Sequence, residues 1–325
     1  MPTSPPTPVS RVVGNSVLDA RSDTRIWGAR SLWVWWHMLS LDAPTVAVVW
    51  CWFFAKIFGL TLPRVALPTL ALGTWSVYVA DRLLDGWRSA DTVTLRDRHW
   101  FYLRHRKPFV VAWTIAAVPL AYLIFFRVSH VVRIDDIILC LIGIAYFLLI
   151  HGRRSGNSVT RRLPDWLPKE LMVGFLFAIA TAVPTWSRLA GNRGLLTAAI
   201  FTFGAACWLN CVAIQTWEDA EASQEIMHTI LSSSGSDKEI LRPHVITEFL
   251  GRHLSAFAVA VGGLAFCLAY VTVNSTVWPL FAAVGLSAVL FLGLIRYSRR
   301  FSALALRIAA DAALLTPLLF LIRVR

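Results

Sequence analysis

Charged residues are scarce in this chain: Asp, Glu, Lys and Arg make up 15% of its 325 residues, whereas hydrophobic residues make up 57%. So few polar side chains cannot cover a soluble domain of this length, and that class is excluded. Acidic residues are rarer than basic ones, 19 against 31. The basic residues lie in short segments between apolar runs, which favours contact with membrane lipids over nucleic acid. The composition predicts a polytopic membrane protein.

Several motifs of well-known enzyme classes are also missing. The sequence has no Walker A loop and no GxGxxG, so ATP-driven transport and dinucleotide chemistry have no support. Its five cysteines form no CxxC pair, and its eight histidines show no HExxH or similar ligand spacing. The first apolar run is rich in Trp and has no small-residue cleavage site behind it, so we expect no secretory signal.

Nine apolar runs approach the roughly 20 residues that cross a bilayer as a helix. They cover residues 42–60, 65–86, 108–127, 135–151, 167–187, 194–217, 250–272, 276–296 and 302–322. Residues 1–30 are rich in Pro, Ser, Thr and Arg and predict a disordered tail. We therefore expect an all-α bundle of nine transmembrane helices that forms a single domain over residues 31–325.

The basic residues also predict an orientation. With a cytoplasmic N-terminus, 22 of the 31 Lys and Arg residues fall on the cytoplasmic side and eight on the opposite side. Cytoplasmic loops of membrane proteins carry such an excess. We expect an integral protein of the cell inner membrane, with a cytoplasmic N-terminus and an active site that faces the cytoplasm.

Two carboxylates end the second apolar run, in the stretch Tyr78-Val-Ala-Asp81-Arg82-Leu-Leu-Asp85. A helix places Tyr78, Asp81, Asp85 and Arg88 on one face. Acidic groups at this depth are costly unless they are paired, protonated or bound to a cation. Two carboxylates can hold Mg²⁺ while Arg82 and Arg88 contact a diphosphate. Salt bridges between the same Asp and Arg residues explain the pattern equally well.

A second polar cluster ends the sixth run. Gln215, Glu218 and Asp219 share one helical face, and Asn210 falls toward another. Polar side chains inside the last turns of an apolar helix favour a ligand. The alternative is an ordinary hydrated helix end.

Three more charged residues are candidates for the site. Lys169 opens the fifth run, where it either contacts a diphosphate or anchors the helix at the cytoplasmic face. Arg307 and Asp311 lie four residues apart inside the last run, which is the right spacing for them to pair with each other. A pair of this kind is better explained as a lock between helices than as a substrate contact.

The stretch Val77-Tyr-Val-Ala-Asp81-Arg82-Leu-Leu-Asp85 resembles the latter part of the first Asp-rich motif, NDxxDxxxD, of the UbiA superfamily of intramembrane prenyltransferases. Asp81 and Asp85 match the second and third Asp of that motif. Val77 and Tyr78 stand in place of its leading Asn and Asp, so the resemblance is to a divergent member.

The resemblance covers nearly the whole chain, since it extends to nine spans and to a second motif that survives loosely at the end of the sixth run. It implies Mg²⁺ ions held by Asp81, Asp85, Glu218 and Asp219. It also implies a prenyl diphosphate contacted by Tyr78, Arg82, Arg88, Lys169 and Gln215. The prenyl group would pass to a lipophilic acceptor. Two alternatives stay open: a terpene cyclase that uses the same diphosphate site, and a non-catalytic membrane carrier that has lost ligands.

Overall fold

The protein is described by a computed structural model that covers residues 32–88, 101–102, 104–128, 133–134, 137–138, 141, 168–191, 193–232 and 245–321. Within these ranges every regular element is a helix and no strand is present, which confirms the all-α class. The predicted tail, 1–30, lies outside the described residues.

The α-helices differ widely in length, from five to 40 residues. In chain order they are α3 (Leu32–Met38), α4 (Asp42–Ile57), α5 (Ala66–Arg88), α7 (Arg106–Tyr122) with the π-helix η1 (Leu123–Arg127), α9 (Lys169–Trp186), α10 (Arg193–Ser232), α11 (Val245–Arg252), α12 (Leu254–Val271), α13 (Trp278–Tyr297) with the 3-10 turn η3 (Ser298–Arg300), α14 (Ala303–Ala313) and α15 (Pro317–Leu321).

Several of these helices have the length and apolar composition of membrane-spanning helices. Among the described residues, six helical segments are long and apolar enough to cross a bilayer, or seven if α3 and α4 are counted as one bent span. This is compatible with an integral membrane protein. The helix α5 coincides with the second predicted run but is not among the six. Most of the fourth run, 135–151, lies outside the described residues, so the count of nine stays a prediction.

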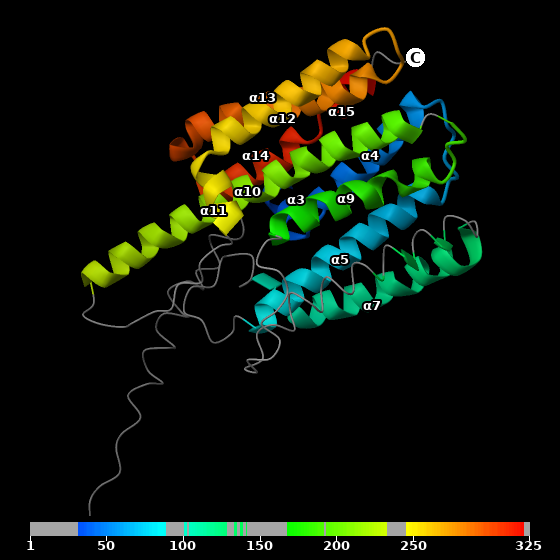
Figure 1. Ribbon diagram of the computed structural model, residues 1–325. Coiled ribbons are helices and arrows are strands. Elements are labelled where there is room, and N and C mark those ends of the chain that lie inside the picture. Colours follow the sequence, from blue (N-terminus) through cyan, green and yellow to red (C-terminus); the bar gives the residue numbers. More distant parts are fainter. Residues whose placement is uncertain are drawn as a thin grey trace, which may run out of the picture.

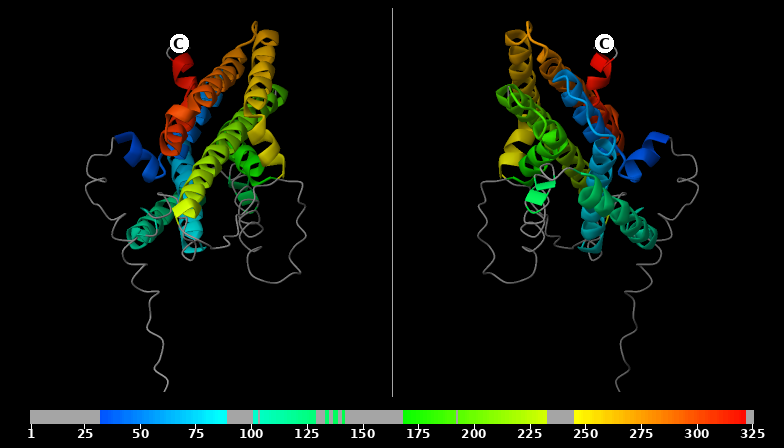
Figure 2. Two further views of the ribbon diagram at one scale, coloured as in Figure 1. Left: turned by 90° about the vertical axis from the view of Figure 1, so that its left-hand side faces the viewer. Right: turned by 90° about the vertical axis from the view of Figure 1, so that its right-hand side faces the viewer.

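The helix α4 lies at the centre of the bundle (Figure 1). It packs against α5 and α9 and also against α13, α14 and α15. The pairs α9–α10 and α12–α13 are the most extensively packed, and α7 packs on α5. Figure 2 shows the same bundle from two sides, with α12 and α13 at the end away from α5 and α7. Residues of α4 are therefore placed to meet side chains from both halves of the chain.

Aromatic side chains fill the core around α4. Trp50 is fully buried, and its ring stacks on that of Phe203 in α10 with 4.1 Å between ring centroids. Its indole N–H donates a 2.7 Å hydrogen bond to the carbonyl oxygen of Leu314, after the end of α14. A buried Trp needs such a partner for its N–H, so this residue joins three helices at one point.

The helices α9 and α10 approach each other closely at Gly174. A Cβ atom at this position would lie 2.6 Å from the backbone nitrogen of Trp208. Small residues at helix interfaces allow this approach, which is typical of helices that pack in membranes. Only glycine fits at this point without moving one backbone away from the other.

The chain turns sharply between α3 and α4, whose axes meet at 90°. Ser40 has a φ of 58°, in the left-handed region that glycine usually occupies at a helix end. The Leu41 N–H bonds to the carbonyl of Trp36, and the Ser40 N–H bonds to that of His37, which together form a Schellman motif. This corner turns the last residues of α3 toward the first turn of α4.

Candidate functional site

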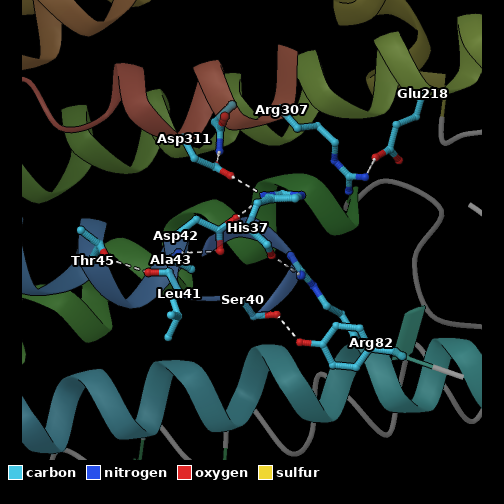
Figure 3. Close-up of polar contacts among 12 residues, drawn as sticks. His37, Ser40, Leu41, Asp42, Ala43, Thr45, Arg82, Glu218, Arg307 and Asp311 are labelled. Carbon is cyan, nitrogen blue, oxygen red and sulfur yellow. Dashed lines mark hydrogen bonds and ion pairs between the residues drawn. The ribbon is translucent and has the colours of Figure 1, made fainter. Parts of the chain in front are cut away.

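Three titratable side chains meet just inside this corner (Figure 3). His37 Nδ1 lies 2.6 Å from Asp42 Oδ2 and 3.8 Å from Asp311 Oδ2. His37 is near the end of α3, Asp42 begins α4 and Asp311 lies in α14, and the His37 side chain is only 3% exposed. We call these three residues the central triad. The bundle thus places two carboxylates and an imidazole together inside its core.

Side chains of α5 and α10 complete the surroundings of the central triad. Asn210 Nδ2 donates a 3.0 Å hydrogen bond to Asp311 Oδ1, and Arg82 Nη1 donates a 3.1 Å bond to the carbonyl oxygen of His37. Both side chains are buried. Two buried polar atoms, Asn210 Oδ1 and His37 Nε2, have no hydrogen-bond partner among the described residues. Such atoms are costly in an apolar core, so they point to a function or a ligand.

Arg82 therefore has a role that its place in the sequence does not indicate. The sequence predicts a contact with a diphosphate, but the guanidinium turns into the bundle and lies over the ring of Tyr102, 5.8 Å from the ring centroid. The hydroxyl of Tyr102 is hydrogen bonded to that of Ser40 at 2.6 Å. Burial raises the pKa of Tyr102, which keeps its phenol neutral. Arg82 and Tyr102 together support the corner between α3 and α4.

A second buried charged group lies along the same two helices, α10 and α14. Arg307 forms an ion pair with Glu218, and both side chains are almost fully buried (Figure 3). The prediction that Arg307 pairs with Asp311 is wrong, because each has its partner on α10 instead. Asn210 bonds to Asp311 and Glu218 to Arg307, which is the order expected when α10 and α14 run antiparallel. The register of the two helices thus decides the pairing.

The acidic end of α10 is partly as predicted. Gln215 Nε2 donates a 2.8 Å hydrogen bond to Asp219 Oδ1, so these two residues share a face and both are half-buried. Glu218 lies one residue away but is turned to Arg307. A metal ion at Glu218 would have to compete with a buried guanidinium.

The acidic end of α5 is described only in part. Asp81 is half-buried on α5, whereas the side chains of Asp85 and Arg88 lie outside those that the structure describes. The expectation that these groups meet Asp219 at one diphosphate site therefore stays a prediction. Tyr78 lies one turn before Arg82, and its ring faces Phe177 of α9 edge-on, with 6.5 Å between centroids.

At the start of α9, the side chain of Lys169 is exposed and that of Glu170 is buried. Glu170 is buried and accepts a 2.7 Å hydrogen bond from the hydroxyl of Thr247 in α11. The Lys169 side chain is 58% exposed, and its Nζ lies 3.8 Å from Glu170 Oε1. An exposed amine at a helix start suits the anchoring alternative that the sequence leaves open for Lys169.

A small cavity adjoins the central triad. It has a volume of about 30 Å³ and is lined by Tyr78 of α5, Asn210 of α10 and Asp311 of α14, together with apolar residues of α4 and α9. This volume is close to that of one water molecule in the liquid. A larger cavity of about 360 Å³ lies near the other end of α4, beside Ile57 and Gly59.

The central triad is the part of the site that could hold a metal ion. One possible ligand atom from each residue lies within 4.8 Å of the others, and no other His, Cys, Asp or Glu group in the described ranges meets this condition. Sequence reasoning missed His37 and Asp42, because neither belongs to a recognised spacing. The sequence did contain one usable signal, which is the presence of titratable residues next to apolar runs. His37 follows a run of Trp and Val, and Asp42 begins an apolar run.

No protein-family model matches this chain, and no curated protein or solved structure matches it either. The resemblance to the UbiA superfamily therefore rests on the motif residues and on the pattern of apolar runs in the sequence.

Proposed function

We propose that this protein is a Mg²⁺-dependent intramembrane enzyme that ionises a prenyl diphosphate and transfers the prenyl group to a lipophilic acceptor. One observation carries the proposal: the helices that bear the two acidic ends, α5 and α10, converge on one polar centre inside an apolar bundle. Tyr78 and Asn210 line the same cavity, and Arg82 and Asn210 both bond to the central triad. Such convergence brings the two helices that carry the motifs to the same part of the bundle.

The donor set at the acidic ends fits Mg²⁺ in part. Asp81, Asp85 and Asp219 offer carboxylate oxygens, which Mg²⁺ prefers, and the hydrogen bond from Gln215 fixes the carboxylate of Asp219. Glu218 is better assigned to charge balance with Arg307. When bound, Mg²⁺ supplies positive charge that offsets the charge developing on the leaving diphosphate.

The protein itself would position the substrate and shield it from water. The cavity of about 30 Å³ is too small for a prenyl group, so we place the diphosphate at the acidic ends of α5 and α10 rather than beside the central triad. The apolar side chains of the surrounding bundle would then exclude water, which would otherwise capture the allylic cation. In keeping with the predicted orientation, this face of an inner-membrane protein opens to the cytoplasm.

The test is the release of pyrophosphate by the purified full-length chain from allylic prenyl diphosphates of several lengths. A lipophilic phenol or quinol panel is added as acceptor, with Mg²⁺ or with a chelator. We expect release that needs Mg²⁺ and that falls about 100-fold or more in the Asp81→Asn/Asp85→Asn variant, as for the loss of groups that stabilise transition-state charge. Glu221→Gln is the matched control, because it removes an exposed carboxylate from the same end of α10.

The two alternatives predict different results in the same assays. A terpene cyclase releases pyrophosphate without any acceptor and yields a cyclic product by mass spectrometry. A carrier releases none, and its solute flux in proteoliposomes is unchanged by Asp81→Asn/Asp85→Asn. The buried charges of the central triad and of Arg307 are the observation that favours a carrier, because charges within a membrane bundle also mark transport pathways.

A further inference from the structure

We propose that His37, Asp42 and Asp311 form a binding site for a divalent transition-metal ion, distinct from the Mg²⁺ site at the acidic ends of α5 and α10. The residues come from α3, α4 and α14, and none of them belongs to the two acidic motifs. This proposal does not depend on the prenyltransferase activity, because it concerns a different set of ligands.

The geometry of the central triad is close to that of a metal site. Ligand atoms that bind one ion at about 2.0–2.2 Å lie roughly 3.0–3.5 Å from one another. His37 Nδ1 is 2.6 Å from Asp42 Oδ2 and 3.8 Å from Asp311 Oδ2, on either side of this range. Side-chain shifts on the order of 1 Å or less bring the three atoms to a common ion, with no movement of the helices.

The charge of this buried group can accommodate a cation. Two carboxylates lie against one imidazole, and Arg82 is the positive side chain that interacts with both of them. A single guanidinium does not neutralise two ionised carboxylates, so either a shared proton or a bound cation must balance the second one, because an unbalanced charge is expensive in a medium of low dielectric constant. A bound metal ion supplies the missing positive charge.

Asn210 provides a second and independent observation. Its side chain is 9% exposed and is aimed at Asp311, but its oxygen Oδ1 has no partner among the described residues. Rotation of the amide by about 180° presents this oxygen, in place of the nitrogen, to the centre of the site. The adjoining cavity of about 30 Å³ has room for one water as a further ligand. The central triad, the amide oxygen of Asn210 and one water together would provide five ligands.

The ligand set indicates the class of metal. Imidazole nitrogen together with carboxylate oxygen suits Mn²⁺, Fe²⁺ or Zn²⁺. Mg²⁺ prefers oxygen ligands and keeps several waters, for which the small cavity leaves no space. The central triad is therefore expected to select a transition metal even when Mg²⁺ is in excess.

Mn²⁺ is the probe for the experiment, because its electron spin resonance reports both the number of bound ions and a coordinating nitrogen. The full-length protein, purified in detergent, is stripped with chelator and loaded with Mn²⁺ under millimolar Mg²⁺. The Asp81→Asn/Asp85→Asn background removes competing binding at the acidic end. We expect one Mn²⁺ per chain with a ¹⁴N coupling from His37.

Two variants and a matched control test the ligands. His37→Gln should abolish the ¹⁴N coupling, and Asp311→Asn should weaken Mn²⁺ binding at least tenfold. Glu170→Gln replaces a buried carboxylate outside the triad, bonded to Thr247, and should bind as the parent does. Circular dichroism and gel filtration identify any variant that does not fold.

If both variants fail to fold, Mn²⁺ binding to the parent protein still decides whether the metal site exists. No stoichiometric Mn²⁺ in the folded parent, or bound Mn²⁺ without ¹⁴N coupling, overturns the metal site and leaves a shared proton as the counter-charge. Pyrophosphate release is measured separately on the native sequence, so failure of this site and failure of the proposed enzyme are told apart.

Discussion

Replacing Arg307 by Met isolates the buried charge of Glu218 and tests what that carboxylate is for. Arg307 and Glu218 are 6% and 5% exposed, so neither can recover its solvation by turning to water. Removing one partner of a buried ion pair costs about 3–5 kcal/mol, because the other charge is left uncompensated. Arg307→Met should therefore lower the free energy of unfolding by about this amount, which corresponds to a fall on the order of 10 °C in the unfolding midpoint.

The double variant Glu218→Leu/Arg307→Met separates a structural pair from a metal ligand. If the pair balances charge, the double variant recovers most of the lost stability, since an apolar replacement of a buried pair is often neutral or better. If Glu218 binds Mg²⁺, the single variant Arg307→Met should regain stability on addition of Mg²⁺, and the double variant should not recover.

The chain offers a matched control for this experiment. Arg252 and Glu248 form an ion pair on α11 with side chains 72% and 44% exposed. Arg252→Met should change the free energy of unfolding by less than about 0.5 kcal/mol, because exposed pairs contribute little. Thermal unfolding in detergent, followed by circular dichroism, measures all of the variants. A cost for Arg307→Met no larger than that for Arg252→Met would refute the reasoning.

Two further predictions concern the backbone. Gly174→Ala should destabilise the protein by about 1–3 kcal/mol, since the added methyl meets the backbone of Trp208 at 2.6 Å, whereas Gly293→Ala, with open space around it, should cost nothing measurable. Ser40→Ala should be less stable than Ser40→Gly by about 1 kcal/mol, because both lose the bond to Tyr102 but only glycine relieves the left-handed backbone. Thermal unfolding checks both pairs, and equal midpoints within either pair would contradict its explanation.

Much of the helical framework could be predicted because an apolar run of about 20 residues has few structures other than a helix. The runs 42–60 and 167–187 agree with α4 and α9 to within three residues at each end. The run 194–217 was too short, since α10 continues to Ser232. Its extension contains Glu218, Glu221 and Glu225, and glutamate favours a helix without being apolar. A hydropathy pattern locates the part of a helix that suits a membrane rather than its full length.

Polar contacts within one helix could be predicted from the sequence, whereas polar contacts between helices could not. The bond between Gln215 and Asp219 could be predicted, because both lie on one helix and the spacing fixes their geometry. Arg307 and Asp311 had an equally suitable spacing, and yet both bond to α10. The register of α14 against α10 decided which residues pair. This register depends on how two helices pack that are about a hundred residues apart in the chain. Spacing shows which side chains can meet but not which partner is preferred.

The corner between α3 and α4 is what makes the central triad possible. His37 and Asp42 are five residues apart, and in one continuous helix they would point about 140° away from each other. They could not then share Asp311 as a common neighbour. The left-handed conformation of Ser40 bends the chain by 90° and brings the two side chains to 2.6 Å. A serine in this conformation is strained, and bonds from Tyr102 and Arg82 hold the corner in place. The same corner that ends α3 therefore also assembles the charged centre.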